Sequence, residues 1–436
     1  MALTRDEILE YHLGGKIGLH VTKPMDTLEA LCKAYTPGVA EAVREISRHP
    51  QTIKTLTAKS NLVGVVTDGT AILGLGDLGA SASIPVMEGK AVLFKAFADV
   101  DGWPIPLDHC RQNGQNSGPT DPQRVIDAVC ALAPMYGGIN LEDIAAPACF
   151  EIEDRLDAML DIPVFHDDQW GTAVITLAGV YNYAQLTGRG LDEIKTVVNG
   201  AGAAGMRITE MLKAAGVKSL LICDSKGVLR SDRPGLSGKK KEHAVATSAH
   251  TLGDALKGAH LFIGVSAADC VKPSDILGMA DTPAIFAMAN PDPEIRPELV
   301  AQTLASKPYI MATGRSDYPN QINNVLGFPF LFRGALDCGA RTINLEMKMA
   351  AARTLADLAR LPVPASVCKI YQQNLAFGPG YIIPKPFDER LFLEIPVAVA
   401  KAAMKSGAAP ADALNLDIYR RQLVERNRGR LITAKP

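Results

Sequence analysis

The sequence predicts an α/β protein with at least two domains, parallel sheets and a helical C-terminal end. Three observations carry this prediction. A chain of 436 residues is too long for one ordinary domain. Short apolar runs repeatedly end in polar residues and are followed by helical patterns, as in βαβ units. The clearest of these units, residues 195–227, carries a glycine-rich turn between two apolar runs.

Composition and charge exclude several classes of function. The chain is 47% hydrophobic and 21% charged, which is typical of a globular protein with a large core. A net charge near −2 gives no electrostatic reason to bind nucleic acid or an anionic membrane. The first residues are charged where a secretory signal would be apolar, and no apolar run is long enough to span a bilayer. The eight cysteines include no CxxC pair, so we expect a cytoplasmic protein.

The N-terminal segment predicts short helices. We expect helices at 5–12 and 26–34, and a third that begins at Pro37. Tyr35 therefore lies just before a helix N-terminus, where the dipole and free N–H groups favour an anionic neighbour. On its own, one tyrosine is more simply interpreted as a half-buried packing residue.

Residues 74–79, GLGDLG, match the dinucleotide-binding pattern G-x-G-x-x-G. They follow a predicted strand at 61–69, and Asp99 comes about 20 residues later, as a ribose-binding acid would. We nevertheless predict a tight turn beside a ligand. Pro85 and Gly89 should prevent the full-length helix that a dinucleotide-binding turn requires.

Lys90 follows that turn, and in this interpretation it stands at the mouth of an apolar strand, 91–98. A lysine in that place can simply be a solvent-exposed surface residue without a functional role. If it is partly desolvated instead, its pKa falls and it can act as a base.

Two pairs of adjacent carboxylates stand at the ends of predicted strands. Glu142 and Asp143 form the first pair, and Asp167 and Asp168 the second. Like charges packed together resist joint ionisation, which a divalent cation would relieve. Together the pairs could supply three or four oxygen ligands, which suit Mg²⁺ or Mn²⁺. The alternative is an ordinary polar loop tip with an aspartate as helix N-cap.

The strongest local signal is GAGAAG within residues 195–227, between an apolar run and an uninterrupted helical pattern. Gly200 makes the turn, Gly202 admits a pyrophosphate, and Gly205 allows close packing of helix on strand. This unit predicts a Rossmann-type, doubly wound domain that binds a dinucleotide. The predicted cofactor-binding loop comprises Gly200, Gly202, Ala203, Ala204 and Gly205.

The second apolar run of this unit ends at Asp224. Its carboxylate would accept a hydrogen bond from the ribose 2′-hydroxyl of NAD and repel the 2′-phosphate of NADP. Ser225 and Lys226 follow at once and could bind that phosphate. NAD is therefore slightly favoured, and NADP stays open. We interpret the later lysine run 239–241 as a solvated charge cluster.

Further strands are expected at 260–266 and 283–289, and Asn290 follows the second. Arg315 and Asn324 lie near another strand end. Amide side chains there can hold carboxylates or a carboxamide, although asparagine is also an ordinary turn residue.

The C-terminal part predicts helices at 333–360 and 388–407, with a proline-rich linker at 377–387 between them. The predicted division is an N-terminal domain at 1–162, a dinucleotide-binding domain at 163–385 and a helical segment at 386–436.

The chain closely resembles malic enzymes, specifically the short bacterial type without a phosphotransacetylase-like extension. The resemblance runs from about Lys23 to Ser406 and rests on AYTPGV, GLGDLG, EGK, NLEDI, FHDDQxGT, NGAGAAG, ANPxPE, TGRSDYPNQ and NNVLxFPF in this order. It implies an N-terminal α/β malic-enzyme domain, an NAD(P)-binding domain and C-terminal helices. It also implies oxidative decarboxylation of L-malate to pyruvate and CO₂ with NAD⁺ or NADP⁺ and Mg²⁺ or Mn²⁺.

The matched motifs also imply roles for single residues. Tyr35 and Lys90 match the catalytic pair, and Asp167 matches the partner of the lysine. The implied cation ligands are Glu142, Asp143 and Asp168. The implied amides on the substrate and cofactor side are Asn290 and Asn324. The resemblance further implies a homodimer in which Tyr35 or Lys90 can serve the active site of the neighbouring subunit.

The chain departs from the family pattern at three places. Trp170 stands where bacterial relatives usually have histidine. Thr70 and Ala71 replace the substrate-binding arginine that larger relatives carry before GLGD, and Arg315 is a candidate substitute. The 108–121 loop is longer and more polar than expected. Two other functions stay open: a metal-dependent oxaloacetate decarboxylase, and a non-catalytic sensor of nicotinamide dinucleotide or malate.

Overall fold

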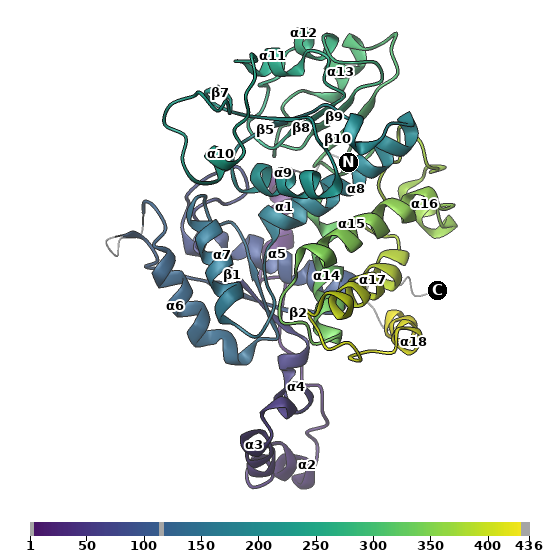
Figure 1. The fold of residues 1–436 in the computed structure, drawn as a ribbon. Helices are drawn as coiled ribbons and strands as arrows, with labels where there is room; N and C mark the ends of the chain where they lie inside the picture. Colours follow the sequence, from purple (N-terminus) through teal and green to yellow (C-terminus); the bar gives the residue numbers. More distant parts are fainter. Residues whose placement is uncertain (1–3, 113–116, 429–436) are drawn as a thin grey trace.

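The computed structural model describes residues 4–112 and 117–428. They form two parallel sheets with surrounding helices, and an arm of short helices that projects from one end (Figure 1). No helix among the described residues is both long and apolar enough to cross a membrane. Part of the 108–121 loop, residues 113–116, lies outside the described residues.

The first sheet has four parallel strands in the order β2-β1-β3-β4. They are β1 (Leu62–Thr67), β2 (Asp101–Pro106), β3 (Gly138–Leu141) and β4 (Val164–His166). The connecting helices are α5 (Ala80–Ala98), α6 (Pro122–Leu132) and α7 (Ala148–Met159). α5 packs against β1 and β2, and α7 packs against β4. The predicted pairs of acids directly follow β3 and β4, so both lie at the carboxyl edge of this sheet.

The second sheet has the order β10-β9-β8-β5-β6-β7, in which only β7 is antiparallel to its neighbour. Its strands are β5 (Thr196–Asn199), β6 (Leu220–Asp224), β7 (Gly227–Val228), β8 (Leu261–Gly264), β9 (Ala284–Ala287) and β10 (Ile310–Thr313). The chain leaves β5 for β6 on one side and returns to β8 on the other. This confirms the doubly wound prediction and puts the switch point between β5 and β8, where such folds bind ligands.

Helices complete the second sheet and the C-terminal part. Those around the sheet are α8 (Thr172–Thr187), α9 (Ala203–Ala215), α10 (Gly238–Glu242), α11 (Leu252–Leu256), α12 (Pro273–Leu277) and α13 (Pro297–Thr303). The C-terminal helices are α14 (Phe328–Asp337), α15 (Leu345–Arg360), α16 (Ala365–Tyr371), α17 (Arg390–Ser406) and α18 (Leu416–Asn427). The helix predicted at 333–360 is thus two helices. α17 packs on α14 and α15, and α15 packs on α8, so these helices share the main core.

The proline-rich segment 377–387 is not an exposed linker. Tyr381, Ile382 and Ile383 are at most 2% exposed. Asn182 donates to the Ile382 carbonyl at 2.7 Å, and the Ile382 N–H donates to Asn320 at 2.8 Å. The buried side-chain amides of Asn182 and Asn320 therefore provide the hydrogen bonds that the Ile382 N–H and C=O would otherwise lack, because Ile382 pairs with no strand.

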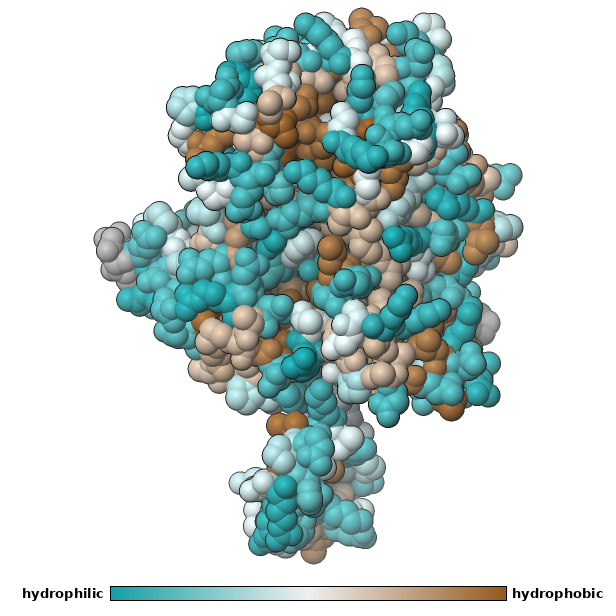
Figure 2. Space-filling view, viewed as in Figure 1, coloured by the Kyte–Doolittle hydropathy of each residue, from teal (hydrophilic) through white to brown (hydrophobic). Residues whose placement is uncertain are grey.

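The arm consists of α2 (Leu28–Ala34), α3 (Val39–Arg48) and α4 (Ile53–Leu56), and it follows α1 (Arg5–His12). The predicted helices are confirmed, although α2 and α3 each begin two residues later than predicted. None of the four helices has a buried residue, and α2 to α4 project from the body (Figure 1). Hydrophobic side chains reach the surface of the arm (Figure 2). Its exposed apolar residues include Leu28, Leu31, Tyr35, Val39, Val43 and Leu56.

The prediction around Lys90 was wrong in its secondary structure. Residues 80–98 form one helix, α5, which runs through Pro85 and Gly89, so 91–98 is not a strand. A proline inside a helix costs about 3 kcal/mol and a glycine about 1 kcal/mol. Burial of one helix face offsets this cost. The buried residues are Ala80, Ser83, Met87, Lys90, Ala91, Phe94, Phe97 and Ala98.

The strand β4 belongs to the first sheet, although it follows the predicted domain boundary. Ile139, Asn140 and Leu141 of β3 pair with β4, so β4 completes the first sheet. A boundary between 162 and 163 would separate this strand from its sheet. Pairing depends on residues more than 20 positions earlier in the chain, which the local pattern does not reveal.

Candidate active site

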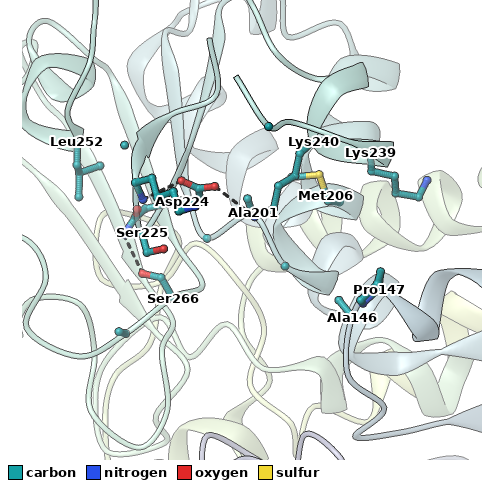
Figure 3. A pocket seen from close by; sticks show the side chains of 18 of the residues that line it. Ala146, Pro147, Ala201, Met206, Asp224, Ser225, Lys239, Lys240, Leu252 and Ser266 are labelled. Atoms are coloured by element: carbon teal, nitrogen blue, oxygen red, sulfur yellow. Dashed lines mark hydrogen bonds and ion pairs between the residues drawn. The ribbon is translucent and has the colours of Figure 1, made fainter. Parts of the chain in front are cut away.

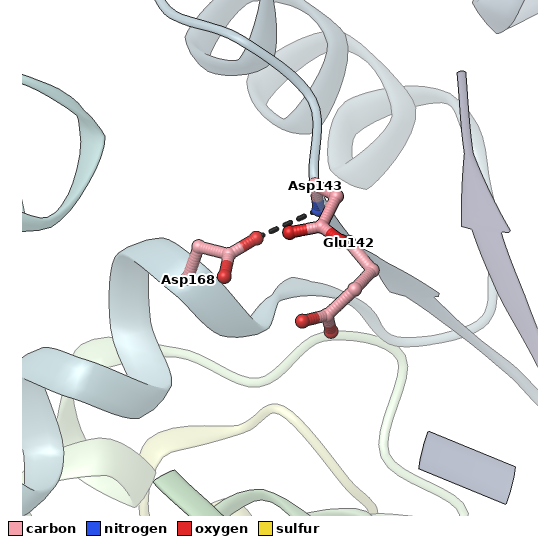
Figure 4. A group of neighbouring side chains, drawn as sticks. All are labelled: Glu142, Asp143 and Asp168. Carbon is pink, nitrogen blue, oxygen red and sulfur yellow. Dashed lines mark hydrogen bonds between the residues drawn. The ribbon is translucent and has the colours of Figure 1, made fainter. Parts of the chain in front are cut away.

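Three carboxylates gather where β3 and β4 end. Glu142 and Asp143 follow β3, and Asp168 lies in the π-helical turn Asp167–Gly171 after β4. One oxygen from each lies within 4.8 Å of the other two. Asp168 and Asp143 point toward one another, and the Asp143 N–H donates to Asp168 Oδ2 at 2.8 Å (Figure 4).

The electrostatics of this cluster fit a divalent cation. Burial, followed by the charge of Asp168, raises the pKa of Glu142 well above its usual value. The same two causes raise the pKa of Asp143 to about 7. Asp143 Oδ2 is buried without a hydrogen-bond partner. A hard cation would compensate the crowded charge and occupy the unpartnered oxygen, and carboxylate oxygens are the ligands that Mg²⁺ and Mn²⁺ prefer.

Lys90 projects from α5 into the same cluster. Its ammonium pairs with Asp167, lies 3.0 Å from Glu142 Oε1, and stands 4.5 Å from the centroid of the Phe328 ring. Burial lowers the pKa of Lys90, but Asp167, Glu142 and Asp168 outweigh burial and raise it above the usual lysine value. Two of these acids belong to the cation cluster. Charge compensation there would therefore favour the neutral amine that a base requires.

Asp167 lies fully buried beside this lysine. It also accepts a hydrogen bond from the Asn324 amide. Burial raises the pKa of Asp167 to about 6, with Lys90 opposing the rise. A Cβ at Gly171 would lie 1.9 Å from Asp167 Oδ1, so only glycine fits there. Asn140 donates to Glu142 Oε2 at 3.0 Å, a contact that the sequence did not indicate.

A cavity of about 1100 Å³ lies at the carboxyl ends of β5, β6 and β8 (Figure 3). Gly200 has φ +121°, which favours glycine, and a Cβ there would meet the Val265 carbonyl at 2.4 Å. Gly202 lines the cavity. A Cβ at Gly205 would lie 1.7 Å from the Gly200 carbonyl oxygen, so helix α9 can approach this loop only with glycine there. Ala203 and the following residues begin α9, whose N-terminus suits a phosphate.

Asp224 lines this cavity with its charge already compensated. It pairs with Arg233 at 2.5 Å. It also pairs with Lys240 at 3.2 Å (Figure 3). Burial raises its pKa, but hydrogen bonds from Arg233, the Lys226 backbone and Lys240 outweigh burial and lower the pKa to about 2. Lys239 also lines the cavity, so two members of the predicted solvated lysine run face the ligand site.

The remaining predicted residues make no hydrogen bond or ion pair with the three carboxylates. Tyr35 is 68% exposed on the arm, between α2 and α3. Asn290 is exposed after β9, and a Cβ at Gly314 would lie 3.2 Å from its amide nitrogen. Arg315 donates to both oxygens of Asp317, at 2.9 and 2.7 Å. Its guanidinium is therefore already paired within the protein.

The fold and the site define a two-domain α/β protein with a dinucleotide-binding sheet and a carboxylate site beside a buried lysine. Two family models agree with this description. The malic enzyme N-terminal domain matches residues 14–157, and the malic enzyme NAD-binding domain matches residues 170–368. The chain belongs to the malic enzyme family. The second match includes GAGAAG and excludes GLGDLG, as the sequence predicted.

Relatives cover nearly the whole chain. An NADP-dependent malic enzyme of Rhizobium meliloti is 51% identical over 98% of this chain and 55% of its own length. An NADP-dependent malic enzyme of Halomonas elongata is 49% identical over 93% of this chain and 94% of its own length. The malic enzyme structure from Pyrococcus horikoshii has a TM-score of 0.85 at 39% identity and covers 97% of this chain and 96% of that one. The chain spans about half the length of several curated relatives, including the first.

Proposed function

We propose that the chain catalyses the oxidative decarboxylation of L-malate to pyruvate and CO₂, with NAD(P)⁺ and a divalent cation. The observation that carries this proposal is the buried Lys90, held between Asp167 and the carboxylate cluster, in a chain with a malic enzyme NAD-binding domain. The names of the relatives support the choice of malate as substrate.

The buried residues divide the proton and hydride chemistry between them. Lys90 accepts the proton of the C2 hydroxyl while the C2 hydride passes to the nicotinamide. Asp167 holds the lysine in place. A divalent cation bound by Glu142, Asp143 and Asp168 would act as a Lewis acid toward the substrate oxygens.

The second half of the reaction needs a proton at C3. The bond from C3 to the departing carboxylate breaks, CO₂ leaves, and the electron pair stays with C3. Tyr35 then supplies the proton, directly or through Lys90. The hydrogen bond from Asn324 to Asp167 supports a role for Asn324 in orienting substrate at the same point. We assign Asn290 to the substrate and cofactor side.

The direct test incubates the chain with L-malate, Mn²⁺ and each dinucleotide. Pyruvate and reduced nicotinamide should form in equal amounts, and absence of turnover with both dinucleotides would reject the proposal. An oxaloacetate decarboxylase would instead release CO₂ from oxaloacetate without nicotinamide and would tolerate Gly202→Ala. A sensor would bind malate or dinucleotide without turnover. We also propose a cytoplasmic location, which the eight free cysteines support.

We infer that NADP⁺ is the preferred dinucleotide, against the slight preference for NAD that Asp224 suggested. Arg233 and Lys240 neutralise the Asp224 carboxylate, so its repulsion of a 2′-phosphate is weakened. Ser225 and Lys226 line the same end of the cavity and add donors.

Replacing Lys240 with alanine tests this preference. The KM for NADP⁺ should rise about tenfold, as loss of one charge-assisted contact of about 1.5 kcal/mol implies, while the KM for NAD⁺ changes little. Lys241→Ala is the matched control, because Lys241 belongs to the same helix but is exposed and does not line the cavity. Equal effects on both dinucleotides would contradict the assignment.

The two adjacent aspartates should differ in what they control. Asp168→Asn removes one charged ligand from the cation cluster and should chiefly raise the Kd for Mn²⁺, by at least the roughly 10- to 100-fold that loss of an outer-shell partner costs. Asp167→Asn removes the partner of Lys90 and should chiefly lower kcat. Isothermal titration with Mn²⁺ and steady-state kinetics on both variants separate the two effects. The assignment fails if the two variants change both quantities alike.

We further propose that the protein works as a homodimer and that Tyr35 serves the active site of the partner subunit. Tyr35 lies on the exposed arm, while Lys90 is buried in the body. No residue of α2, α3 or α4 is fully buried within one chain, and several of their apolar side chains are exposed, which is typical of a surface that another subunit covers.

A further inference from the structure

The turn that carries Asp167 and Asp168 depends on contacts from other elements. It is a π-helical turn, and its N-cap residue, His166, makes no side-chain hydrogen bond to it. Such turns are rare and concentrate at functional sites, where the surrounding structure has to maintain them. The question is which side chains hold this one.

One carboxylate from α7 holds both ends of the turn. Glu153 is 4% exposed. Its Oε1 accepts from the His166 backbone N–H at 2.9 Å, and its Oε2 accepts from the indole N–H of Trp170 at 3.1 Å. His166 directly precedes Asp167, and Trp170 comes two residues after Asp168. Both acids therefore lie between two points that Glu153 fixes.

Arg207 connects this clamp to the dinucleotide-binding helix α9. Its Nη2 donates to Glu153 Oε2 at 3.2 Å and to Asp154 at 3.1 Å. Its Nε donates to Gln169, inside the turn, at 2.9 Å. The guanidinium carbon lies 4.5 Å from the centroid of the Trp170 ring. Arg207 is only 5% exposed, so its buried charge requires compensation. The carboxylates of Glu153 and Asp154 supply it.

Trp170 suits this position in two ways. Its N–H is the donor that reaches Glu153, and its ring stacks with two cations. The second cation is Lys348 of α15, whose ammonium lies 3.7 Å from the ring centroid. A tryptophan face attracts cations more strongly than other aromatic rings do. These contacts account for a residue at which the chain departs from its family pattern.

We propose that Glu153 is a positioning residue for the cation site, and that Trp170 is the donor through which it holds the far end of the turn. Glu153 is not one of the three clustered carboxylates. It sets the placement of Asp167 toward Lys90 and of Asp168 toward Glu142 and Asp143. The inference rests on the proposed cation site.

The test measures Mn²⁺ affinity of the full chain by electron paramagnetic resonance titration, without malate or dinucleotide. Glu153→Gln keeps the side-chain length but replaces one acceptor oxygen with an N–H₂ donor, which must face either the indole N–H and Arg207 or the His166 N–H. Its Kd for Mn²⁺ should rise about 10-fold or more. Trp170→Phe keeps a ring and removes the donor, and should raise the Kd less. The double variant should lose less Mn²⁺ affinity than the sum of the two single losses, because both substitutions disrupt the same contact between Glu153 and Trp170.

Glu151→Gln is the matched control, because Glu151 lies on the same helix, is 54% exposed and pairs with Arg155. It should bind Mn²⁺ as the wild type does. Saturating Mn²⁺ should restore most of the malate turnover of Trp170→Phe, which a general loss of folded protein would not allow.

The outcomes separate this inference from the function on which it rests. If the wild type binds no Mn²⁺, the cation site itself is wrong. If the wild type binds Mn²⁺ and both Glu153→Gln and Trp170→Phe bind it equally well, the positioning role is overturned. It is also overturned if both variants lose dinucleotide affinity and thermal stability in parallel with Mn²⁺ affinity.

Discussion

Replacing Lys90 with arginine is expected to lower kcat for malate oxidation by about 10²- to 10⁴-fold, the range that a positioned general base contributes. Arginine keeps a cation beside Asp167 and Glu142, so the charge balance of the buried cluster is preserved. It cannot release its proton at any ordinary pH, so it cannot accept the proton of the C2 hydroxyl. The loss should therefore appear in turnover while dinucleotide binding persists.

The control for this variant is Lys95→Arg. Lys95 lies on the same helix and pairs with Asp99 at 2.7 Å and Asp101 at 3.0 Å, outside the carboxylate cluster. Steady-state kinetics and fluorescence titration with the dinucleotide measure both variants. Turnover of Lys90→Arg near the wild-type rate would remove Lys90 from the role of base. An equal loss in Lys95→Arg would attribute the effect to the helix instead.

The parts of the site that local sequence encodes were predictable. The unit β5, α9 and β6 combines apolar runs, spaced glycines and an unbroken helix within about 30 residues, and each signal is local. The acids after β3 and β4 were predictable for the same reason. Parallel strands bring their carboxyl ends to one edge, which predicts where each acid pair lies. That Glu142 and Asp168 meet also requires β3 and β4 to be neighbours in one sheet, which the local pattern does not reveal.

The errors arose where distant packing outweighs local preference. Pro85 and Gly89 argue against a helix, yet α5 forms because its buried face packs against β1, β2 and α14. Lys239 and Lys240 resemble a solvated run, but Glu210 and Asp224, 29 and 16 positions earlier, bind them. No local pattern reveals partners at that separation.

Mixing two inactive variants should restore activity if Tyr35 serves the partner subunit. Tyr35→Phe removes the proposed acid and Lys90→Arg the proposed base, so each homodimer lacks one group in both of its active sites. A mixed dimer has one site with wild-type Lys90 and wild-type Tyr35. Random exchange of subunits makes half of the dimers mixed, so activity should recover to about a quarter of the wild-type value.

Activity recovers only if the arm crosses to the other subunit. The experiment therefore distinguishes a Tyr35 that acts in the partner's active site from one that acts in its own. If Tyr35 serves its own chain, the mixed dimer carries one site without the acid and one without the base, and mixing restores nothing. Tyr11→Phe replaces Tyr35→Phe in the control, because Tyr11 is equally exposed in α1 but has no proposed role. That variant should be active alone, and mixing it with Lys90→Arg should dilute activity. Capture of one tagged variant together with its untagged counterpart establishes that mixed dimers are present in each mixture, so a lack of recovery can be assigned to the position of Tyr35.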